Sequence, residues 1–236
     1  MSKIAVVLPT RNRPERLEKF ISSAFEKCND IENIRFYLYI DLDDEITVPK
    51  VQELNERYGK RIGFIVGPRT MMSQTANALL PYIQKEEIFY LGADDLIIRT
   101  PDWDKLIIEF FDQHHDKIVL GYGHDGLQPE LATHPILHRR WVECVGYLTP
   151  PYFESDFADT WINHLAALCG NRKQRIEFYN EHMHYFAGKS EADQTFIENR
   201  NRYKFQDPQL VFNCLRPVME RDARRLLGLI ESLKND

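Results

Sequence analysis

Short apolar runs alternate with segments of helical spacing through the first hundred residues of this chain. The runs cover residues 3–8, 34–40, 61–66 and 87–91, and the helical segments cover 17–25, 51–58 and 73–83. Residues 3–8 are β-branched and apolar without polar alternation, which is typical of a strand covered on both faces. Alternating strands and helices build a mainly parallel sheet whose ligands bind beyond the carboxyl ends of the strands. The sequence therefore predicts an α/β fold with Thr10, Asp41, Gly67 and Asp94 at one functional edge.

The order is less regular after Pro101. We expect helices at 103–111, 159–169 and 193–200, a strand at 117–122, and a loop at 123–134, while 136–145 fits either a strand or a helix. Residues 218–233 form a clear amphipathic pattern, and we expect this last helix to pack on the body of the protein rather than on a membrane.

Composition excludes several classes of protein. The chain of 236 residues is 43% hydrophobic and 28% charged, like an ordinary globular protein, and holds no apolar run near the length of a membrane span. The apolar stretch 4–8 is too short for a secretory signal, and four scattered cysteines without a CxxC pair favour a reducing, cytoplasmic setting. A net charge of -6 disfavours a protein that binds nucleic acid mainly by counterion release. The basic patches at 11–16, 139–140 and 172–175 are expected to be solvated surface.

Two adjacent carboxylates, Asp94 and Asp95, follow the apolar run 87–91. Like charges at the end of a buried strand repel each other, and a divalent cation compensates them well. Mg²⁺ or Mn²⁺ would take one or two carboxylates and complete its shell with water and substrate phosphates, which links the pair to a nucleotide diphosphate. The alternative is a turn in which one aspartate caps the next segment.

Four motifs resemble the inverting family 2 glycosyltransferases with the GT-A fold: VVLPTRNRPERL, YIDLDD, GPRTMMSQTANALL and LGADD. The resemblance implies a nucleotide-diphosphate sugar as donor and Mn²⁺ or Mg²⁺ as cofactor. It assigns donor-binding roles to Pro9, Thr10, Arg11, Asp41, Asp43, Arg69 and Asp94, with Asp43 a weaker candidate than Asp41. It assigns the metal to Asp95. Gly92 stands where the family often has a first carboxylate.

The segment ECVGYLTPPYFESDFADTWINHL resembles the acceptor side of the same family, where an acidic residue that opens a helix is the catalytic base. Such a base removes the proton of the attacking acceptor hydroxyl. Asp159 fits this pattern best, Asp156 comes next, and Glu154 is a third contender. A helix N-cap is the structural alternative for Asp159.

The resemblance also implies a second metal ligand from the His182-Met183-His184 run, because a late histidine in such enzymes approaches the metal or diphosphate. His184 is favoured over His182, and Lys189 of the same loop is a candidate for contact with phosphate. A surface His-x-His without a ligand is the alternative. The other histidines considered show no ligand spacing: His114, His115, His134 and His138.

The resemblance implies one GT-A-like domain over 1–236, with a nucleotide-sugar-binding half at 1–99, an acceptor and catalytic half at 100–216, and a C-terminal helix at 217–236. The expected function is metal-dependent, inverting transfer of a sugar to an acceptor hydroxyl. The alternatives are a nucleotidyltransferase, which normally has a glycine-rich phosphate loop, and a nucleotide-sugar-binding module that has lost catalysis. The acceptor stays open among a glycan, a lipid-linked glycan, a protein and a modified nucleic-acid base.

Overall fold

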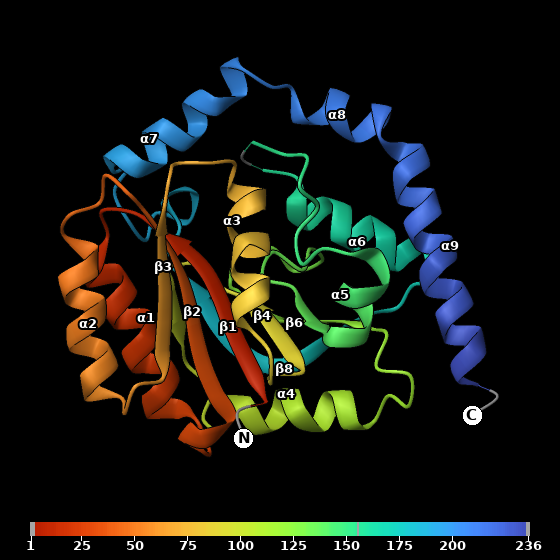
Figure 1. Ribbon diagram of the computed structural model, residues 1–236, viewed down its shortest axis with the longest axis horizontal. Coiled ribbons are helices and arrows are strands. Elements are labelled where there is room, and N and C mark those ends of the chain that lie inside the picture. Colours follow the sequence, from red (N-terminus) through yellow and green to blue (C-terminus); the bar gives the residue numbers. More distant parts are fainter. Residues whose placement is uncertain (1–2, 155, 235–236) are drawn as a thin grey trace.

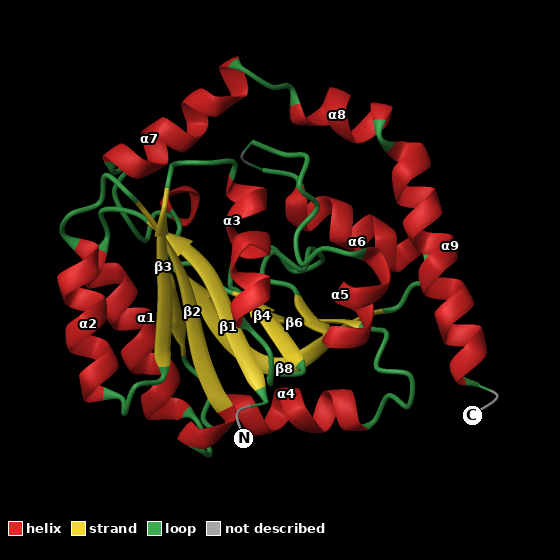
Figure 2. Cartoon of the chain, in the orientation of Figure 1, coloured by secondary structure: helices red, strands yellow, loops and turns green. Residues whose placement is uncertain are grey.

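The computed structural model describes residues 3–154 and 156–234, and it has a single twisted sheet between two layers of helices (Figures 1 and 2). Eight strands follow the order β3-β2-β1-β4-β7-β6-β8-β5. The sheet therefore runs through both halves of the chain.

The first half forms the parallel part of the sheet, as the alternating pattern predicts. Its strands are β1 (Ile4–Thr10), β2 (Ile34–Asp41), β3 (Ile62–Gly67) and β4 (Ile88–Leu91). β1 lies between β2 and β4, and all of these pairings are parallel. Thr10 and Asp41 end neighbouring strands, so their side chains meet at the same edge.

Alternate residues of β1 enter different cores, because successive side chains of a strand point to opposite faces. Val6 and Leu8 pack against the layer that contains α1 (Pro14–Lys27), α2 (Thr47–Arg57) and α4 (Trp103–Asp112). Ala5 and Val7 pack into the core on the other side. The helices of that side are α3 (Met72–Leu79), α5 (Arg139–Val145), α6 (Ala158–Leu168) and α9 (Arg216–Leu233).

The structure defines two segments in more detail than the sequence prediction did. The helix expected at 73–83 ends at Leu79 and continues as the 3-10 turn Leu80–Tyr82, because Pro81 has no N–H and its ring clashes with the preceding helical turn. The segment 136–145, for which the sequence allowed either a strand or a helix, contains one of each: the strand β7 (Ile136–His138) is followed directly by α5.

Three further strands follow along the chain, β5 (Leu96–Ile98), β6 (Leu120–His124) and β8 (Lys173–His182), and the sequence predicted only β6 among them. β8 runs parallel to β6 and antiparallel to β5. Its buried positions alternate with charged ones, so it lacks the continuous apolar run that identified the central strands.

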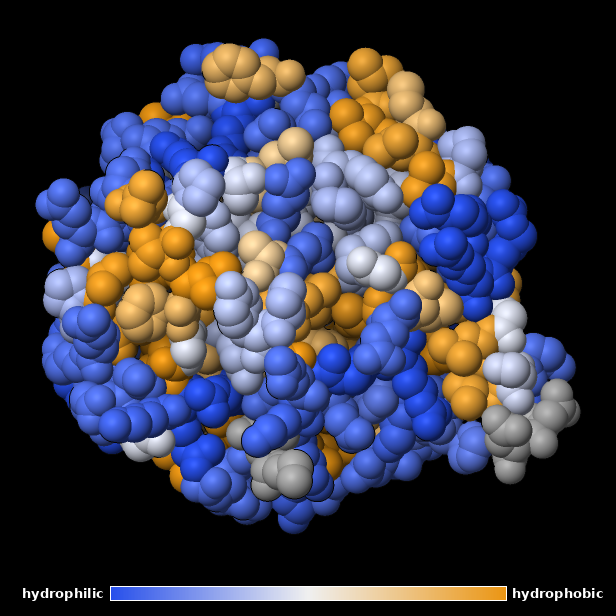
Figure 3. Space-filling view, viewed as in Figure 1, coloured by the Kyte–Doolittle hydropathy of each residue, from blue (hydrophilic) through white to orange (hydrophobic). Residues whose placement is uncertain are grey.

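The C-terminal segment forms an arc around the molecule (Figure 1). It contains the helical turns Tyr185–Ala187 and Arg202–Lys204, and the helices α7 (Gln194–Asn201), α8 (Pro208–Cys214) and α9. α9 packs on α5 and α6 through Met219, Leu226 and Ile230, which confirms that its apolar stripe faces the body. Apolar atoms also gather over α8, where the Leu210 side chain is exposed (Figure 3). Within the described residues, the structure has no helix long and apolar enough to cross a membrane.

Candidate active site

A cleft of about 470 Å³ opens at the carboxyl ends of β1, β2 and β4. Both halves of the chain line it, and it brings together most of the predicted site residues. Those in its wall are Pro9, Thr10, Arg11, Asp41, Arg69, Asp94, Asp95, Asp156, Asp159 and His184. Asp43 and Glu154 are not among its lining residues; the Asp43 side chain is 60% exposed and pairs with Arg11 at the rim.

Asp94 lies at the bottom of the cleft and is held from two sides. The Thr10 hydroxyl donates to its Oδ2 atom at 3.0 Å, and Arg13 Nη1 donates to its Oδ1 atom at 3.0 Å. Burial raises the pKa of Asp94 to about 6, with a further contribution from the negative Asp95, while Arg13 acts in the opposite direction. Arg13 therefore supplies the main positive charge that keeps this carboxyl ionised.

Asp95 contacts a histidine two positions from the one favoured by sequence. His182 Nε2 lies 3.2 Å from Asp95 Oδ1; the His182 side chain is buried and the Asp95 side chain is 11% exposed. Burial by itself would raise the pKa of Asp95, but the hydrogen bond and charge of His182 outweigh it and lower the pKa. His184 packs beside His182 with 4.8 Å between ring centroids, and its Nδ1 accepts the Phe186 N–H, so its Nε2 is the nitrogen free to face a ligand.

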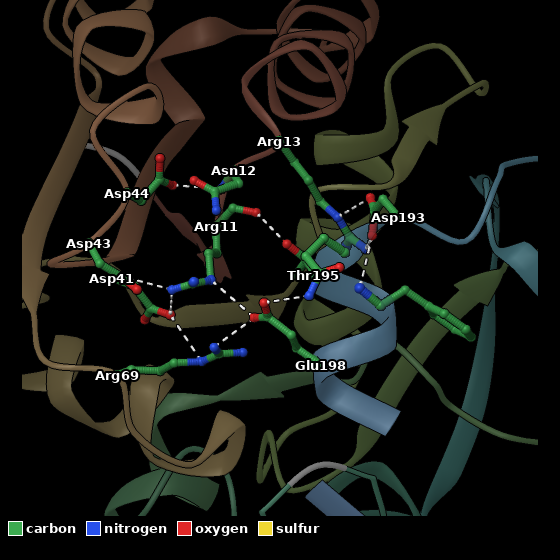
Figure 4. Close-up of polar contacts among 12 residues, drawn as sticks. Arg11, Asn12, Arg13, Asp41, Asp43, Asp44, Arg69, Asp193, Thr195 and Glu198 are labelled. Carbon is green, nitrogen blue, oxygen red and sulfur yellow. Dashed lines mark hydrogen bonds and ion pairs between the residues drawn. The ribbon is translucent and has the colours of Figure 1, made fainter. Parts of the chain in front are cut away.

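Two arginines and two acids form an ionic network at the β2 side of the cleft (Figure 4). Arg11 Nη1 lies 3.5 Å from Asp41 Oδ2, and Arg69 Nε lies 3.8 Å from the same oxygen. Glu198 of α7 completes the network, 2.7 Å from Arg69 and 3.7 Å from Arg11. Burial raises the pKa of Asp41, partly offset by the two arginines.

α7 is fixed across this side of the cleft by its first turn (Figure 4). Asp193 caps the helix by accepting the Phe196 N–H at 2.8 Å, and it also pairs with Arg13 at 2.7 Å and Arg16 at 3.3 Å. The Thr195 hydroxyl donates to the Arg11 carbonyl at 3.1 Å. A segment about 180 residues away in sequence thus covers the first loop of the fold.

Asp44, which sequence reasoning missed, holds the two loops at this edge together. Its Oδ2 accepts the Asn12 N–H at 2.7 Å and its Oδ1 accepts the Thr47 N–H at 3.0 Å. An N-cap pattern would not have identified Asp44, since the N-cap position of α2 is Ile46, two residues further on.

On the acceptor side, Asp159 and Asp156 have different surroundings. Burial raises the pKa of Asp159 to about 6, and its Oδ1 accepts the Thr160 N–H at 2.7 Å. Asp156 instead pairs with Arg200 at 2.8 Å. Asp159 lies in the first turn of α6, and Phe157, with φ of 80°, occupies the N-cap position, so the N-cap alternative for Asp159 is wrong.

Gly92 occupies a position with little room for a side chain. A Cβ atom there would lie 3.0 Å from Phe20 Cε1 and 3.4 Å from Val6 Cγ1. The close approach of α1 and β1 therefore explains why this chain has glycine where a carboxylate would otherwise extend the acidic motif.

Arginines concentrate in the cleft although the chain as a whole is acidic. Six of them line it: Arg11, Arg13, Arg16, Arg69, Arg200 and Arg202. Arg202 Nη1 donates to the carbonyls of Thr70 and Glu154, each at 2.9 Å, and so joins loops of both halves. By contrast, Arg172 is bound by Asp116 at 2.6 Å, away from the cleft. The basic pattern at 11–16 is therefore a part of the site and not merely solvated surface.

The arrangement has the features of a nucleotide-sugar-dependent glycosyltransferase with the GT-A fold: a mainly parallel sheet, an acidic pair at its edge, and a cleft that both halves line. The chain belongs to glycosyl transferase family 2, whose family model matches residues 5–169. No curated protein sequence matches the chain.

Solved structures confirm the fold at low sequence identity. A mannosyltransferase from Pyrobaculum calidifontis, PcManGT in complex with GDP-Man and Mn²⁺, is 12% identical with a TM-score of 0.67, over 98% of this chain and 73% of that one. S. aureus TarS 1–349 in complex with UDP-GlcNAc is 13% identical with a TM-score of 0.65, over 95% and 70% of the respective chains. GalNAc-T7 with UDP, GalNAc and Mn²⁺ is 10% identical with a TM-score of 0.62, over 77% of this chain and 44% of that one.

Proposed function

We propose that this chain transfers a sugar from a nucleotide-diphosphate donor to an acceptor hydroxyl, with inversion at the anomeric carbon and with help from a divalent cation. The observation that carries the proposal is the position of Asp159, a carboxyl with its pKa raised to about 6, in the same cleft as Asp94 and Asp95. A base with a pKa close to neutral is well matched to proton removal from a hydroxyl at physiological pH.

The donor would bind along the edge of the parallel strands. Pro9, Thr10 and Arg11 would lie against the base, while Asp41 and Arg69 would offer one acceptor and one donor group to its polar edge. Arg13 and its neighbouring arginines give the cleft the positive charge that a diphosphate needs. Asp94, tied to Thr10 and Arg13, would contact the ribose or the diphosphate.

Asp95 and His184 are the groups that we assign to Mn²⁺ or Mg²⁺. Asp95 offers an oxygen ligand beside the buried Asp94, which suits a hard cation, and the imidazole makes Mn²⁺ a better fit than Mg²⁺. When bound, such an ion neutralises the charge that develops on the leaving diphosphate. His182 already contacts Asp95 and would hold that carboxylate in place.

The reaction would proceed by a single displacement. Asp159 takes the proton of the acceptor hydroxyl, the acceptor oxygen forms the new bond to the anomeric carbon, and the bond from that carbon to the diphosphate oxygen breaks with its electron pair. Arg13 and the other cleft arginines remain to bind the diphosphate that leaves. Asp156 is less suited to be the base because Arg200 engages its carboxylate.

The acceptor remains one of the four classes named from sequence, and a reducing, cytoplasmic setting is proposed because all four cysteines are free thiols. The test is to follow hydrolysis or transfer with a panel of UDP- and GDP-sugars, with and without Mn²⁺. We expect at least one donor to turn over in a Mn²⁺-dependent way. A panel with no binding and no turnover in correctly folded protein contradicts the proposal.

A further inference from the structure

Three buried side chains that could bind a metal ion meet behind the acidic pair, and only one of them, His182, also contacts a residue of the proposed donor site. Asp125 follows β6, His134 precedes β7, and His182 ends β8. Their exposed fractions are only 4%, 7% and 7%. One ligand atom from each lies within 4.8 Å of the others, so small side-chain movements would bring all three onto one ion.

One carboxylate oxygen of Asp125 lacks a hydrogen-bond partner among the described residues. Its Oδ1 accepts the N–H groups of Leu127 and Gln128, both at 2.8 Å. Its Oδ2 is buried and has no hydrogen-bond partner among the described residues. An unpaired buried carboxylate oxygen is costly, because desolvation is not compensated. A cation at this oxygen would remove the cost.

The two imidazoles are arranged as ligands with supporting outer contacts. His134 Nε2 lies 3.5 Å from His182 Nδ1, a separation suited to two nitrogens on one ion. The Leu91 carbonyl hydrogen-bonds the His134 ring; with the proton on Nδ1, the Nε2 atom presents a lone pair to His182. On its other side, His182 Nε2 faces Asp95 Oδ1 at 3.2 Å.

His182 lies between two partners, with one ring nitrogen toward each of them. A metal ion between His182 Nδ1 and His134 Nε2 would bind both nitrogens and leave the His182 Nε2–H to donate to Asp95. Asp95 then becomes the carboxylate that orients a metal-bound histidine, a common outer-shell arrangement.

We propose that Asp125, His134 and His182 form a buried site for a transition-metal ion of the Zn²⁺ class, separate from the donor-side cation on the other side of Asp95. Two imidazoles and one carboxylate are a ligand set that favours such ions over Mg²⁺. His134 and His182 both reach the wall of the cleft, which leaves room for a water as a further ligand. The bound ion would hold His182, and through it the Asp95 carboxylate, in one orientation. This site does not depend on the donor, the acceptor or the proposed transfer reaction.

The test uses Co²⁺ and Zn²⁺ alone, without nucleotide, on the full chain after treatment with a chelator. We expect one equivalent of Co²⁺ to bind with the intense visible bands of a four- or five-coordinate ion, and Zn²⁺ but not Mg²⁺ to displace it. X-ray absorption of the wild-type complex should show two imidazoles. A wild-type chain that binds no Co²⁺, or binds it without imidazole, overturns the proposal even if no variant folds.

Variants locate the ion. Asp125→Asn and His134→Gln should each weaken Co²⁺ binding by more than the roughly 10–100-fold expected for loss of an outer-shell partner. His164→Gln is the matched control, because it removes an exposed imidazole on α6 that belongs to neither proposed metal position, and it should leave Co²⁺ binding unchanged. If Co²⁺ binding instead follows His184 and is insensitive to Asp125→Asn, the ion occupies the donor-side position and the proposal is wrong.

Discussion

Asp159 is the residue whose protonation most directly connects stability with the proposed reaction. Its pKa in the folded protein is raised from 3.8 to about 6, so the folded state holds this proton more tightly than the unfolded chain does. Stability contributed by the neutral form is therefore lost as pH rises through about 4 to 6. Above this range the ionised carboxylate costs up to about 3 kcal/mol, and less where water in the cleft screens it.

Asp159→Asn should therefore be inactive in transfer and yet more stable than the wild type at pH 8, by about 1 to 3 kcal/mol. Asparagine keeps the oxygen that accepts the Thr160 N–H but cannot accept the acceptor proton. Denaturant unfolding at pH 8 and pH 4 should show the difference only at the higher pH. Transfer by the wild type should fall as pH drops below about 6. Retained turnover in the variant would assign the base to Asp156 or Glu154.

Gly92 provides a test of packing beneath the acidic motif. Gly92→Ala should destabilise the protein by about 1–3 kcal/mol, because the new methyl group meets Phe20 and Val6 in a filled core. Phe20→Leu should relieve part of this cost, so the double variant should be more stable than additivity predicts by at least about 0.5 kcal/mol.

Gly228→Ala is the control for the Gly92 substitution. Gly228 lies in α9 with no heavy atom within 4 Å of an added Cβ, so alanine should be neutral or stabilising by up to about 1 kcal/mol. Equal effects at both positions in urea unfolding would mean that Phe20 does not restrict position 92.

The sequence predicted the position of a site residue where that residue lies at the end of a strand. Asp41 and Asp94 follow apolar runs, so the position of their strands places them in the cleft. Arg13 and its partner Asp193 could not be paired in advance, since their contact joins residues 180 apart and depends on the path of the C-terminal segment. His134 was missed for the same reason, because its partner His182 lies on a strand that the charged sequence of β8 concealed.

At the scale of elements, α7 is the segment most easily separated from the donor cleft. It contributes one buried residue, Thr195, and it is held mainly by ion pairs of Asp193 and Glu198. Glu198→Gln should weaken two of these pairs, each with a free energy of about 0.2–1 kcal/mol. Together the two pairs amount to about 0.4–2 kcal/mol, so local opening of α7 should become about 2- to 30-fold more frequent, and hydrogen exchange of its amides faster by the same factor.

The matched variant for this experiment is Glu220→Gln in α9. Glu220 also pairs with an arginine, Arg216, at 3.2 Å, but on a different helix. It should leave the exchange of α7 amides unchanged. Unaltered α7 exchange in Glu198→Gln, measured by mass spectrometry, would show that apolar contacts rather than ion pairs hold the helix.

β1, β2 and β4 were predictable because they are buried on both faces and read as continuous apolar runs, and the edge strand β3 has an apolar run although it is only partly buried. β5 has only three residues, and β8 alternates charged and buried positions, so neither has that pattern. α7 was predicted as a helix, but its position over the cleft was not, since a helix pattern gives no information about which loop the helix will cover.

At the scale of the whole molecule, two kinds of contact join the two halves of the chain: the apolar cores and the charged groups of the cleft. The cleft joins them through charged groups, with Arg202 between the loops at Thr70 and Glu154, and Asp193 against Arg13. A donor that fills this cleft would therefore contact both halves at once. Donor binding should therefore raise the free energy of unfolding of the whole chain, because the unfolded chain has no such site.

A nucleoside diphosphate with Mn²⁺ should consequently raise the melting temperature of the whole chain in one transition. At a ligand concentration of about 100 times Kd the gain is about 2.7 kcal/mol, which corresponds to roughly 5–11 °C for a domain of this size. We expect UDP or GDP with Mn²⁺ to produce the shift, the same nucleotide with chelator to produce a smaller one, and Asp95→Ala to abolish the difference. Glu143→Ala, which removes an exposed carboxylate on α5, should behave as the wild type. A shift in Asp95→Ala that still depends on Mn²⁺ would mean that another group holds the donor-side cation.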